Sequence, residues 1–354
     1  MTPGAENQLR FHRAELRDWT GRMLVQAGVD AEDAELAAEG LVRADARGFK
    51  THGLARLPNY LEKFTSGALT AGVEPFIQRN GAFIRYDARN TLGQICGPRA
   101  VGATINLARQ QPVAVCQLVN AGHLGALGIN LLPAAEAGMV ALMFQATPPI
   151  IGIPGAQAPL IGNNPLAMAA PRENGPPIVV DFACCMAARG NILLAARDGT
   201  PIPEGWALDR QGRGTTDPDE ALLGALLPFG GHKGIALAMI VEILAGSLAG
   251  GEFQSSLNQG KSVKSGVGGL SALILIFNPA AMQGRTSYAA HVEAWTTHYQ
   301  TQGGGAARIP GHRAHQEELQ ANQRGVVLLQ TIVSELIEIG QIAGLPFPEP
   351  VSQS

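Results

Sequence analysis

A potential proton donor and a potential carboxylate-binding cation stand close together in one short segment, residues 43–56. His52 lies between a hydroxyl residue, Thr51, and Gly53, and Arg56 follows one helical turn later. An imidazole beside a hydroxyl can hold or relay a proton, and an arginine can bind a carboxylate through two parallel hydrogen bonds. If a helix begins at Gly53, both side chains lie on one face. We therefore interpret His52 as an acid/base and Arg56 as a carboxylate clamp; a capped helix start with a surface histidine is the alternative.

Two glycine-rich segments stand where a helix is expected to begin. Residues 120–128 contain His123 and follow a short apolar run, and residues 228–234 contain His232 and Lys233 ahead of an apolar helical pattern. Glycine lets a ligand approach the backbone, and the amides at a helix start bind phosphate. Both segments therefore predict contacts with a phosphorylated cofactor. A tight turn and a plain loop are the respective alternatives.

Two further groups of polar side chains could face a ligand. Asn163 could hydrogen-bond a polar ligand and Asp181 a ribose hydroxyl, although turn chemistry alone explains an Asn-Pro sequence. Residues 308–313 place two arginines on a Pro-Gly turn, which suits phosphate or carboxylate. His312 and His315 form an HxxH pair, but no cysteine or acidic ligand stands at matched spacing, so the sequence predicts no metal site.

The composition excludes several classes of protein. The chain has 354 residues, of which 46% are hydrophobic and 16% charged, and its formal net charge is -3. Such a chain is not intrinsically disordered, and its charge gives no reason to expect a nucleic acid or an anionic membrane as partner. No apolar run is long enough to span a bilayer. The four cysteines form no CxxC pair and the N-terminus shows no signal-peptide pattern, so we expect reduced thiols and a cytoplasmic protein.

The order of the expected elements predicts an α/β (α+β) protein. Apolar residues at helical spacing occur near both ends, over residues 7–47, 291–300 and 316–342, and Asp30 could cap the second helix. The middle of the chain holds short apolar runs that predict strands, at residues 82–87, 113–119, 140–145, 178–182 and 273–277. We expect a helical domain built from both termini with a sheet domain inserted into it. The predicted boundaries are residues 1–72 plus 285–354 for the helical domain and 73–284 for the sheet domain.

The usual dinucleotide-binding fingerprint is missing from the sequence. The nearest match to G-x-G-x-x-G, residues 266–271, precedes an apolar strand pattern, whereas the motif needs a helix N-terminus to receive the pyrophosphate. We interpret this stretch as a hairpin or loop. No Walker A sequence occurs either, which argues against a standard Rossmann domain.

Taken in order along the chain, these segments resemble the malate/L-lactate dehydrogenase family, which is distinct from the Rossmann-fold lactate and malate dehydrogenases. The family also includes ureidoglycolate and sulfolactate dehydrogenases and Δ1-piperideine-2-carboxylate reductase. The resemblance runs from about residue 10 to residue 345. The motifs specific for the family are Arg43-x-Asp45-x-x-Gly48-x-x-Thr51-His52-Gly53-x-x-Arg56, Gly162-Asn163-Asn164-Pro165 and Gly231-His232-Lys233-Gly234.

The resemblance implies a non-Rossmann, largely antiparallel cofactor-binding sheet domain and a homodimer. It also implies hydride transfer between NADH or NADPH and C2 of a 2-oxo or 2-hydroxy acid of the malate or lactate type. His52 is then the proton donor, Thr51 takes the place of the family's usual serine, and Arg56 and Asn163 bind the substrate. The residues implied to contact NAD or NADP are His123, Leu124, Gly125, Ala126, Leu127, Asp181, Phe182, Ala183, His232, Lys233, Arg308, Pro310, Gly311 and Arg313.

Departures from the family's pattern keep a second substrate class open. By the resemblance, the cyclic-imine reductases have Thr where Asn163 stands and Asp, completing a Ser-His-Asp relay, where Asn191 stands. An Asn cannot accept a proton, so that relay is incomplete here. Yet residues 229–237 lack the tyrosine that malate-type members have after the lysine-glycine pair, which is similar to the imine reductases. An NADPH-dependent reductase of a cyclic 2-imino acid (Δ1-piperideine-2-carboxylate or Δ1-pyrroline-2-carboxylate) is therefore the alternative, and a non-catalytic binding protein on the same scaffold is a third.

Overall fold

The main layer of the protein is a seven-stranded sheet. The computed structural model describes residues 8–156, 158–250 and 269–351. Neighbouring strands run antiparallel, apart from the parallel pair β3 and β4, so the predicted non-Rossmann, largely antiparallel sheet is confirmed. The strands follow each other across the sheet in the order β2 (Phe76–Asn80), β3 (Phe83–Asp87), β4 (Val113–Ala121), β13 (Leu270–Phe277), β5 (Val140–Ala146), β8 (Leu166–Ala170) and β9 (Ile178–Phe182).

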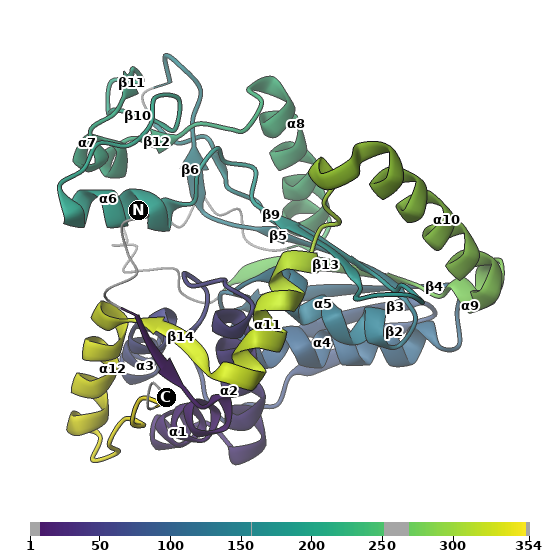
Figure 1. Ribbon diagram of the computed structural model, residues 1–354, viewed down its shortest axis with the longest axis horizontal. Helices are drawn as coiled ribbons and strands as arrows, with labels where there is room; N and C mark the ends of the chain where they lie inside the picture. The colour runs from purple at the N-terminus through teal and green to yellow at the C-terminus, as the bar shows by residue number, and fades with distance from the viewer. Residues whose placement is uncertain (1–7, 157, 251–268, 352–354) are drawn as a thin grey trace.

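Helices cover both faces of this sheet, which explains why its central strands are apolar throughout (Figure 1). One face packs against α4 (Gly93–Ala108) and α5 (Leu127–Glu136). The other face packs against α8 (His232–Val241), the π-helix η3 (Glu242–Ser247) and α10 (Arg285–Gly303). On β13, alternate residues serve the two faces: Ile274 joins the first core and Leu273 the second.

Both ends of the chain build a separate helical core. Its elements are β1 (Gln8–Phe11), α1 (Arg13–Gln26), α2 (Ala31–Ala46), the 3-10 helix η2 (Leu54–Arg56), α3 (Leu57–Thr65), α11 (His312–Arg324), β14 (Val326–Leu329) and α12 (Gln330–Ile342). Buried residues from both ends, such as Trp19 and Leu336, share one cluster, and Trp19 Nε1 donates a hydrogen bond to the Leu345 carbonyl at 2.9 Å. The domain boundaries at residues 72/73 and 284/285 stay a prediction.

Two helical segments differ from the prediction because a pair of short strands interrupts them. The helical pattern predicted over residues 316–342 is not continuous: α11 ends at Arg324, and Gly325 follows it with a φ of 91° that suits glycine. The next four residues form β14, which pairs antiparallel with β1 inside the predicted helical stretch 7–47. Asp30 stands at the N-cap of α2, as predicted, but its side chain forms no capping hydrogen bond.

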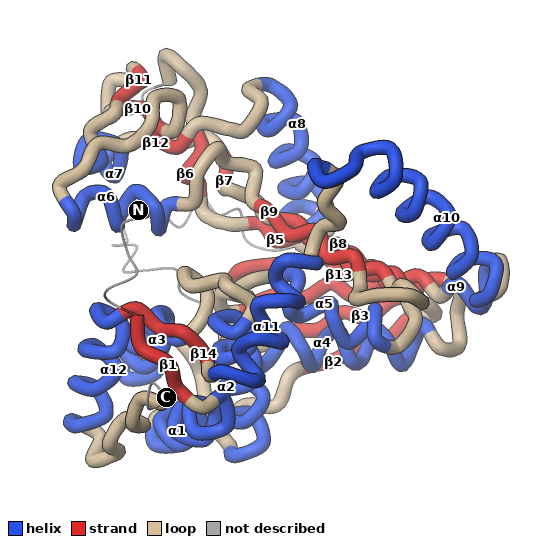
Figure 2. The backbone as a smooth tube through the Cα atoms, viewed as in Figure 1, coloured by secondary structure: helices blue, strands red, loops and turns tan. Residues whose placement is uncertain are grey.

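A further layer, built on a separate five-stranded sheet, lies beyond the end of the main sheet (Figure 2). Its five strands lie in the order β11 (Gly214–Thr215), β10 (Ala207–Leu208), β12 (Ala225–Leu226), β6 (Pro149–Ile151) and β7 (Ile161–Gly162). They pack with α6 (Arg189–Asp198), α7 (Pro218–Leu223) and part of α8 around Ile151 and Ile192. The remaining short helices are α9 (Pro279–Met282) and η5 (Gly304–Ala306). Strands of two or three residues are too short for a periodic pattern, so the sequence did not predict this layer.

Three remaining sequence predictions concern membranes, thiols and the glycine stretch. In the described ranges, no helix is long and apolar enough to cross a membrane. All four cysteines are buried and unpaired. Residues 266–268 of the glycine stretch lie outside the described residues, and Leu270 begins β13 rather than a helix.

Candidate active site

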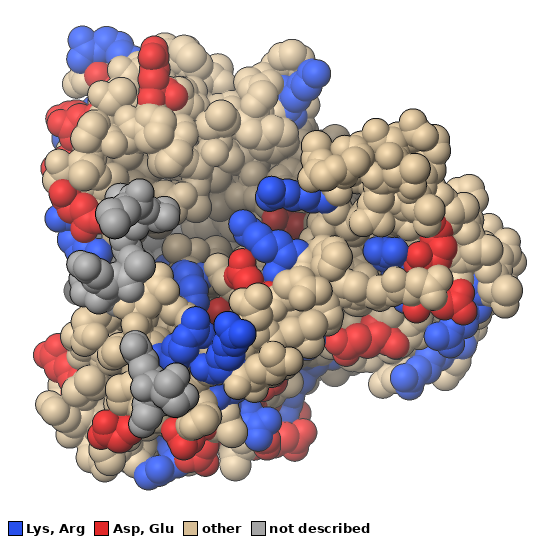
Figure 3. Space-filling view, viewed as in Figure 1, with Lys and Arg blue, Asp and Glu red and all other residues tan. Residues whose placement is uncertain are grey.

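A cavity of about 810 Å³ opens between the loop that joins α2 to α3 and the N-terminal end of α6. Its volume is in the range of cavities that hold small ligands and cofactors, and Figure 3 shows the molecule hollowed between these two parts. The predicted residues that line it are Thr51, His52, Arg56, His123, Gly125, Ala126, Asn163, Asp181, Phe182 and Ala183. The fold thus brings together side chains that are far apart in the sequence.

His52 is held between its neighbours in the loop before η2. Thr51 Oγ1 lies 2.9 Å from His52 Nδ1, and Arg56 Nε donates a hydrogen bond to the Thr51 carbonyl at 2.7 Å. Burial, together with the charge of Arg56, lowers the pKa of His52 to about 4. The imidazole is therefore neutral at pH 7 without a ligand, ready to accept a proton, and an anion bound to Arg56 would favour its protonated form.

Asp45, in the last turn of α2, holds the loop that carries His52. Its Oδ2 accepts a hydrogen bond from the Leu54 amide at 2.7 Å, and burial raises its pKa to about 7. A Cβ on Gly53 would lie 2.2 Å from the Asp45 carboxylate, so glycine is required for this close approach. These contacts explain why Asp45 and Gly53 accompany the histidine in the sequence motif.

We expect Asp45→Ala to lower the free energy of unfolding by about 1–3 kcal/mol, because the buried Leu54 amide loses its acceptor. Asp45→Asn keeps an oxygen in place and should cost less. The folded carboxyl binds its proton more tightly than the unfolded one, so this group makes the wild type less stable as the pH rises from 3.8 to about 7. Asp45→Asn lacks that contribution. Urea unfolding of the wild type and both variants at about pH 5 and about pH 8 checks the loss of stability and its pH dependence. If the stability of Asp45→Asn changes with pH as that of the wild type does, the titration of Asp45 does not contribute.

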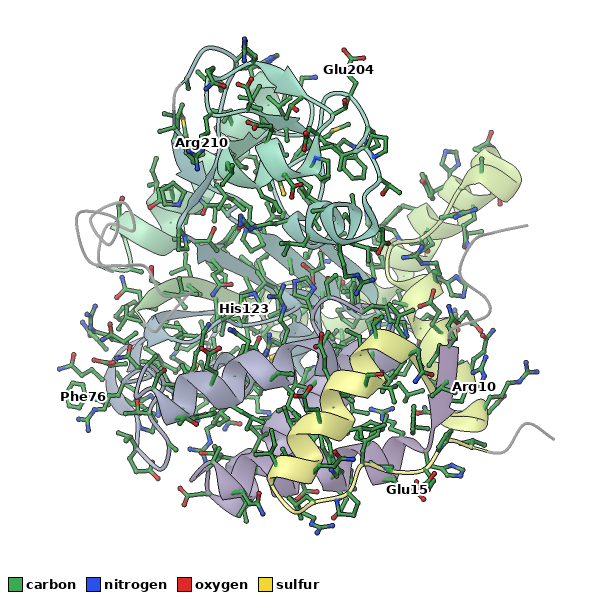
Figure 4. All side chains as sticks on the ribbon, turned by 90° about the vertical axis from the view of Figure 1, so that its left-hand side faces the viewer. Arg10, Glu15, Phe76, His123, Glu204 and Arg210 are labelled. Carbon is green, nitrogen blue, oxygen red and sulfur yellow. The ribbon has the colours of Figure 1, made fainter. Side chains whose placement is uncertain are left out.

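A second histidine stacks against the first. The ring centroids of His52 and His123 lie 5.9 Å apart, and His123 Nδ1 is 2.8 Å from the Tyr60 hydroxyl. That hydroxyl accepts a hydrogen bond from Gln94 Nε2 at 3.2 Å. Burial and neighbouring positive charges hold the pKa of His123 well below its ordinary value. Figure 4 shows His123 near the middle of the molecule, away from the other labelled side chains.

The end of the cavity near these two rings is positively charged. Arg56 and Lys63 both line it, and in the described part of the chain no carboxylate forms an ion pair with Arg56. Burial lowers the pKa of Lys63, and the Arg56 charge lowers it further. An anionic ligand would relieve this repulsion, so the site suits a carboxylate.

Asn163 and Asn164 have different tasks. Thr147 Oγ1 donates to Asn163 Oδ1 at 2.8 Å, which leaves the Asn163 amide nitrogen as a donor for a ligand. Asn164 is fully buried; its Oδ1 accepts from the Thr147 amide at 3.0 Å and its Nδ2 donates to Glu242 Oε2 at 2.9 Å. Asn163 therefore lines the cavity, whereas Asn164 holds the turn.

Asp181, at the end of β9, caps the start of α5. Its Oδ2 accepts a hydrogen bond from the Gly128 amide at 2.8 Å, and burial raises its pKa to about 6. A carboxylate there occupies an amide that a phosphate would need and adds a negative charge. The geometry thus argues against phosphate at the helix start in segment 120–128. The side chains of Leu124 and Leu127 are buried in the core beneath the sheet, so their backbone is what can face a ligand.

The start of α8 suits a phosphate better. His232 and Lys233 are exposed in its first turn, Gly231 stands at the N-cap, and neither a capping side chain nor an acidic residue occupies that end. Phe229, just before it, packs edge-on against Phe182 of the cavity wall, with ring centroids 5.7 Å apart. The predicted segments around positions 182 and 232 are therefore neighbours in space.

The predicted turn over residues 308–313 packs on β9 but faces a different cavity. That second cavity, about 440 Å³, is lined by Arg308, Pro310, Gly311 and Arg313. The Pro310 carbonyl accepts a hydrogen bond from the Val179 amide at 3.1 Å, and a Cβ on Gly311 would lie 2.9 Å from Val179. The turn thus reaches the same strand as Asp181, although it does not reach the His52 cavity.

These residues fit a nicotinamide nucleotide. Gln145 is buried in the wall of the His52 cavity, and its amide nitrogen has no hydrogen-bond partner among the described residues. Such an orphaned donor suits the carboxamide oxygen of a nicotinamide. The exposed start of α8 and the arginines at positions 308 and 313 supply the cationic groups and free amides that phosphates need.

Sequence reasoning missed several residues of the cavity wall. They are Asn59, Tyr60, Lys63, Gln145 and Thr147, with Gln94 behind Tyr60. Tyr60 and Lys63 follow Arg56 at helical spacing, a signal that could have found them. Gln145 and Thr147 end an apolar run, the same signal that singled out Asp181. Gln94 carries no local signal, because its contact with Tyr60 joins two different helices.

Comparisons with known proteins identify the family of this chain. The sequence profile of malate/L-lactate dehydrogenase matches residues 11–337. The (2R)-3-sulfolactate dehydrogenase (NADP(+)) of Chromohalobacter salexigens is 36% identical over 313 residues, which cover 88% of this chain and 92% of that protein. The Δ1-pyrroline-2-carboxylate/Δ1-piperideine-2-carboxylate reductase of Pseudomonas syringae pv. tomato is 36% identical over 328 residues, which cover 92% and 94% of the two chains.

Solved structures of both kinds of enzyme share the fold. Δ1-piperideine-2-carboxylate reductase from Pseudomonas syringae pv. tomato superimposes with a TM-score of 0.84 at 35% identity and covers 93% of this chain and 99% of its own. Malate dehydrogenase from Pyrococcus horikoshii superimposes with a TM-score of 0.86 at 26% identity and covers 99% of both chains. The protein therefore belongs to the malate/L-lactate dehydrogenase family, and it is an NAD(P)-dependent oxidoreductase.

Proposed function

We propose that the protein transfers hydride to or from C2 of a 2-oxo/2-hydroxy acid. The observation that carries this proposal is the shared cavity of His52 and Arg56. One side chain can move a proton, the other can bind a carboxylate, and a direct hydrogen bond joins Arg56 to the loop of His52. A substrate with a reducible carbon next to a carboxylate matches both groups at once.

In this mechanism the protein positions the substrate and manages one proton. Arg56 binds the carboxylate, and Asn163 offers its amide nitrogen to a second polar group of the substrate. A bound nicotinamide nucleotide supplies or accepts the hydride. His52 Nε2 holds the proton that the substrate oxygen gains in reduction and loses in oxidation, while Thr51 keeps the ring oriented through Nδ1.

A cyclic 2-imino acid is the second candidate substrate. Thr147 places a hydroxyl beside Asn163 in the cavity, so a threonine stands close to where the cyclic-imine reductases are inferred to use one. Asn191 adds nothing to a proton relay: it is exposed on α6, and none of the hydrogen bonds among the described residues joins its side chain to His52. Protonation of an imine nitrogen by His52 would then be the equivalent step.

We further propose that the protein is a cytoplasmic homodimer. Large apolar side chains on α8, on the following π-helix and at its C-cap are at least half exposed, namely Met239, Ile240, Ile243 and Leu248. Exposed apolar patches of this kind typically mark an interface between subunits. The unpaired cysteines suit a reducing compartment. Light scattering of the purified protein tests the dimer, and a monomeric mass at micromolar concentration would contradict it.

A substrate panel with both nucleotides tests the proposed reaction. It consists of pyruvate, oxaloacetate, a ureido-acid, a sulfo-acid and Δ1-piperideine-2-carboxylate, each with NADH and with NADPH. We expect one 2-oxo acid to give a kcat/KM at least about tenfold above the cyclic imine, a difference of about 1.4 kcal/mol in transition-state binding. A preference for the imine would favour the second candidate. Failure of both nucleotides to bind in a fluorescence titration would favour a non-catalytic binding protein.

A further inference from the structure

The hydrogen bonds behind His123 define where its proton lies. Gln94 and Tyr60 are both buried, and Gln94 Nε2 donates to the Tyr60 hydroxyl oxygen. Since that oxygen accepts from Gln94, the phenolic hydrogen is free to point to the other partner within reach, His123 Nδ1 at 2.8 Å. An imidazole nitrogen that accepts a hydrogen bond carries no proton. In a neutral ring the proton is then on Nε2.

The other ring nitrogen of His123 is left for a ligand. His123 lines the large cavity together with His52 and Arg56, and within the described ranges no hydrogen bond reaches its Nε2. The ring is neutral, because burial and the surrounding positive charges disfavour the imidazolium form. His123 and His52 therefore line the same end of the cavity in different settings: His123 is fixed by Tyr60, and His52 contacts Thr51.

We propose that Gln94 and Tyr60 are positioning residues that fix His123 as the Nε2–H tautomer, so that His123 donates a hydrogen bond to an oxygen of the substrate. This inference rests on the proposed function. It makes His123 a residue that polarises the substrate, in addition to its predicted contact with the cofactor, and it leaves proton transfer to His52. A neutral N–H donor directed at a developing negative oxygen stabilises it without giving up its proton.

Two substitutions of His123 separate the two ring nitrogens. Gln places an amide nitrogen near the position of Nε2, and Asn places one near the position of Nδ1. We expect His123→Gln to keep kcat within about tenfold of the wild type, whereas His123→Asn lowers it by about 10²-fold, the cost of losing one such donor. Equal losses in the two variants would overturn the proposal.

The tautomer itself can be read without any turnover. Nitrogen-15 NMR of the histidine-labelled protein near neutral pH should show His123 with the proton on Nε2, its signals being assigned by their loss in His123→Asn. Tyr60→Phe should yield a mixture of tautomers and lower kcat by about fivefold, the loss of one neutral hydrogen bond, with the KM for the nucleotide unchanged. Tyr86→Phe is the matched control, because Tyr86 is equally buried but lies outside the cavity lining. A proton on Nδ1 in the wild type would overturn the proposal.

Two further experiments support this test. If Tyr60→Phe does not fold, Gln94→Met can replace it, because it removes the hydrogen bond that Gln94 donates to the Tyr60 hydroxyl. Oxamate, a 2-oxo acid analogue that is not reduced, tests the ligand contact by titration in the presence of NADPH: its Kd should rise about tenfold in His123→Asn and stay within about threefold in His123→Gln. Unchanged oxamate binding in His123→Asn contradicts the contact with substrate. Failure of the proposed function is a different outcome, in which the substrate panel gives no turnover although the tautomer is as expected.

Discussion

Replacing His52 with alanine is expected to lower kcat/KM for the best substrate by about 10²- to 10⁴-fold, the contribution of a positioned general acid or base. His52 and Arg56 share the cavity wall, and Thr51 holds the ring through Nδ1. Binding of the nucleotide, measured by fluorescence, should stay within about threefold of the wild type, because the loss falls on the proton-transfer step.

The pH dependence gives the His52 prediction a direction. Burial and the charge of Arg56 lower the pKa of His52 to about 4. In hydroxy-acid oxidation the neutral ring is needed, so kcat/KM should rise through about pH 4 and then level off. In oxo-acid reduction the protonated ring is needed, and the protonated fraction falls about tenfold for each pH unit above that pKa. Since the bound carboxylate offsets the Arg56 charge, the profile of kcat should lie at higher pH than that of kcat/KM.

A matched histidine variant provides the control. His298 is exposed on α10. His298→Ala should therefore leave kcat/KM, nucleotide binding and the pH profile unchanged. If His52→Ala keeps kcat/KM within about tenfold of the wild type, His52 is not the group that transfers the proton. A reduced kcat/KM with an unshifted pH profile would assign that profile to another group.

The second large effect is expected at Arg56. Arg56→Met should lower kcat/KM for the acid substrate by about 10²-fold or more, because charge-assisted hydrogen bonds are each worth about 1.5–3 kcal/mol. Much of the loss should appear as a higher KM for the acid. Arg56→Lys keeps the charge but cannot form two parallel bonds to a carboxylate, and it also loses the Nε bond to Thr51. We expect its loss to lie between those of Arg56→Met and the wild type.

The same substitution has a second, independent signature at His52. Removing the Arg56 charge removes one of the causes that lower the His52 pKa. The pH profile of kcat/KM in Arg56→Met should therefore shift to higher pH. Arg79→Met, at an exposed position on β2, is the matched control and should behave like the wild type. A KM for the acid within about threefold in Arg56→Met would refute the carboxylate clamp.

Sequence patterns could locate the parts of this site that are local in the chain. Thr51, His52 and Arg56 lie within six consecutive residues, so their types and spacing predicted that their side chains lie close together. All three line the cavity. The apolar runs that became β4 and β13 were predicted for a similar reason, since a buried strand needs apolar residues on both faces.

Contacts between distant segments carry no such signal. Val326–Leu329 is compatible with a helix by its own residues, and it becomes a strand because β1 supplies a partner. Tyr60 and His123 meet across two segments, so the sequence could suggest each residue but not the hydrogen bond between them. The cap that Asp181 provides for α5 likewise exists only in the folded chain, and it argues against phosphate at one of the predicted places, the helix start in segment 120–128.

The pairing of β1 with β14 sets an order on how the protein can be completed during synthesis. Phe11 pairs with Val326, so the first strand leaves the ribosome long before its partner is made. At a synthesis rate of about 5–20 residues per second, the delay is roughly 15–60 s. All strands of the central sheet, including β13, are synthesised before β14. The apolar residues of α1 and α2 therefore stay partly exposed on the nascent chain until β14 and α12 are made. We expect chaperones to be most needed during this interval.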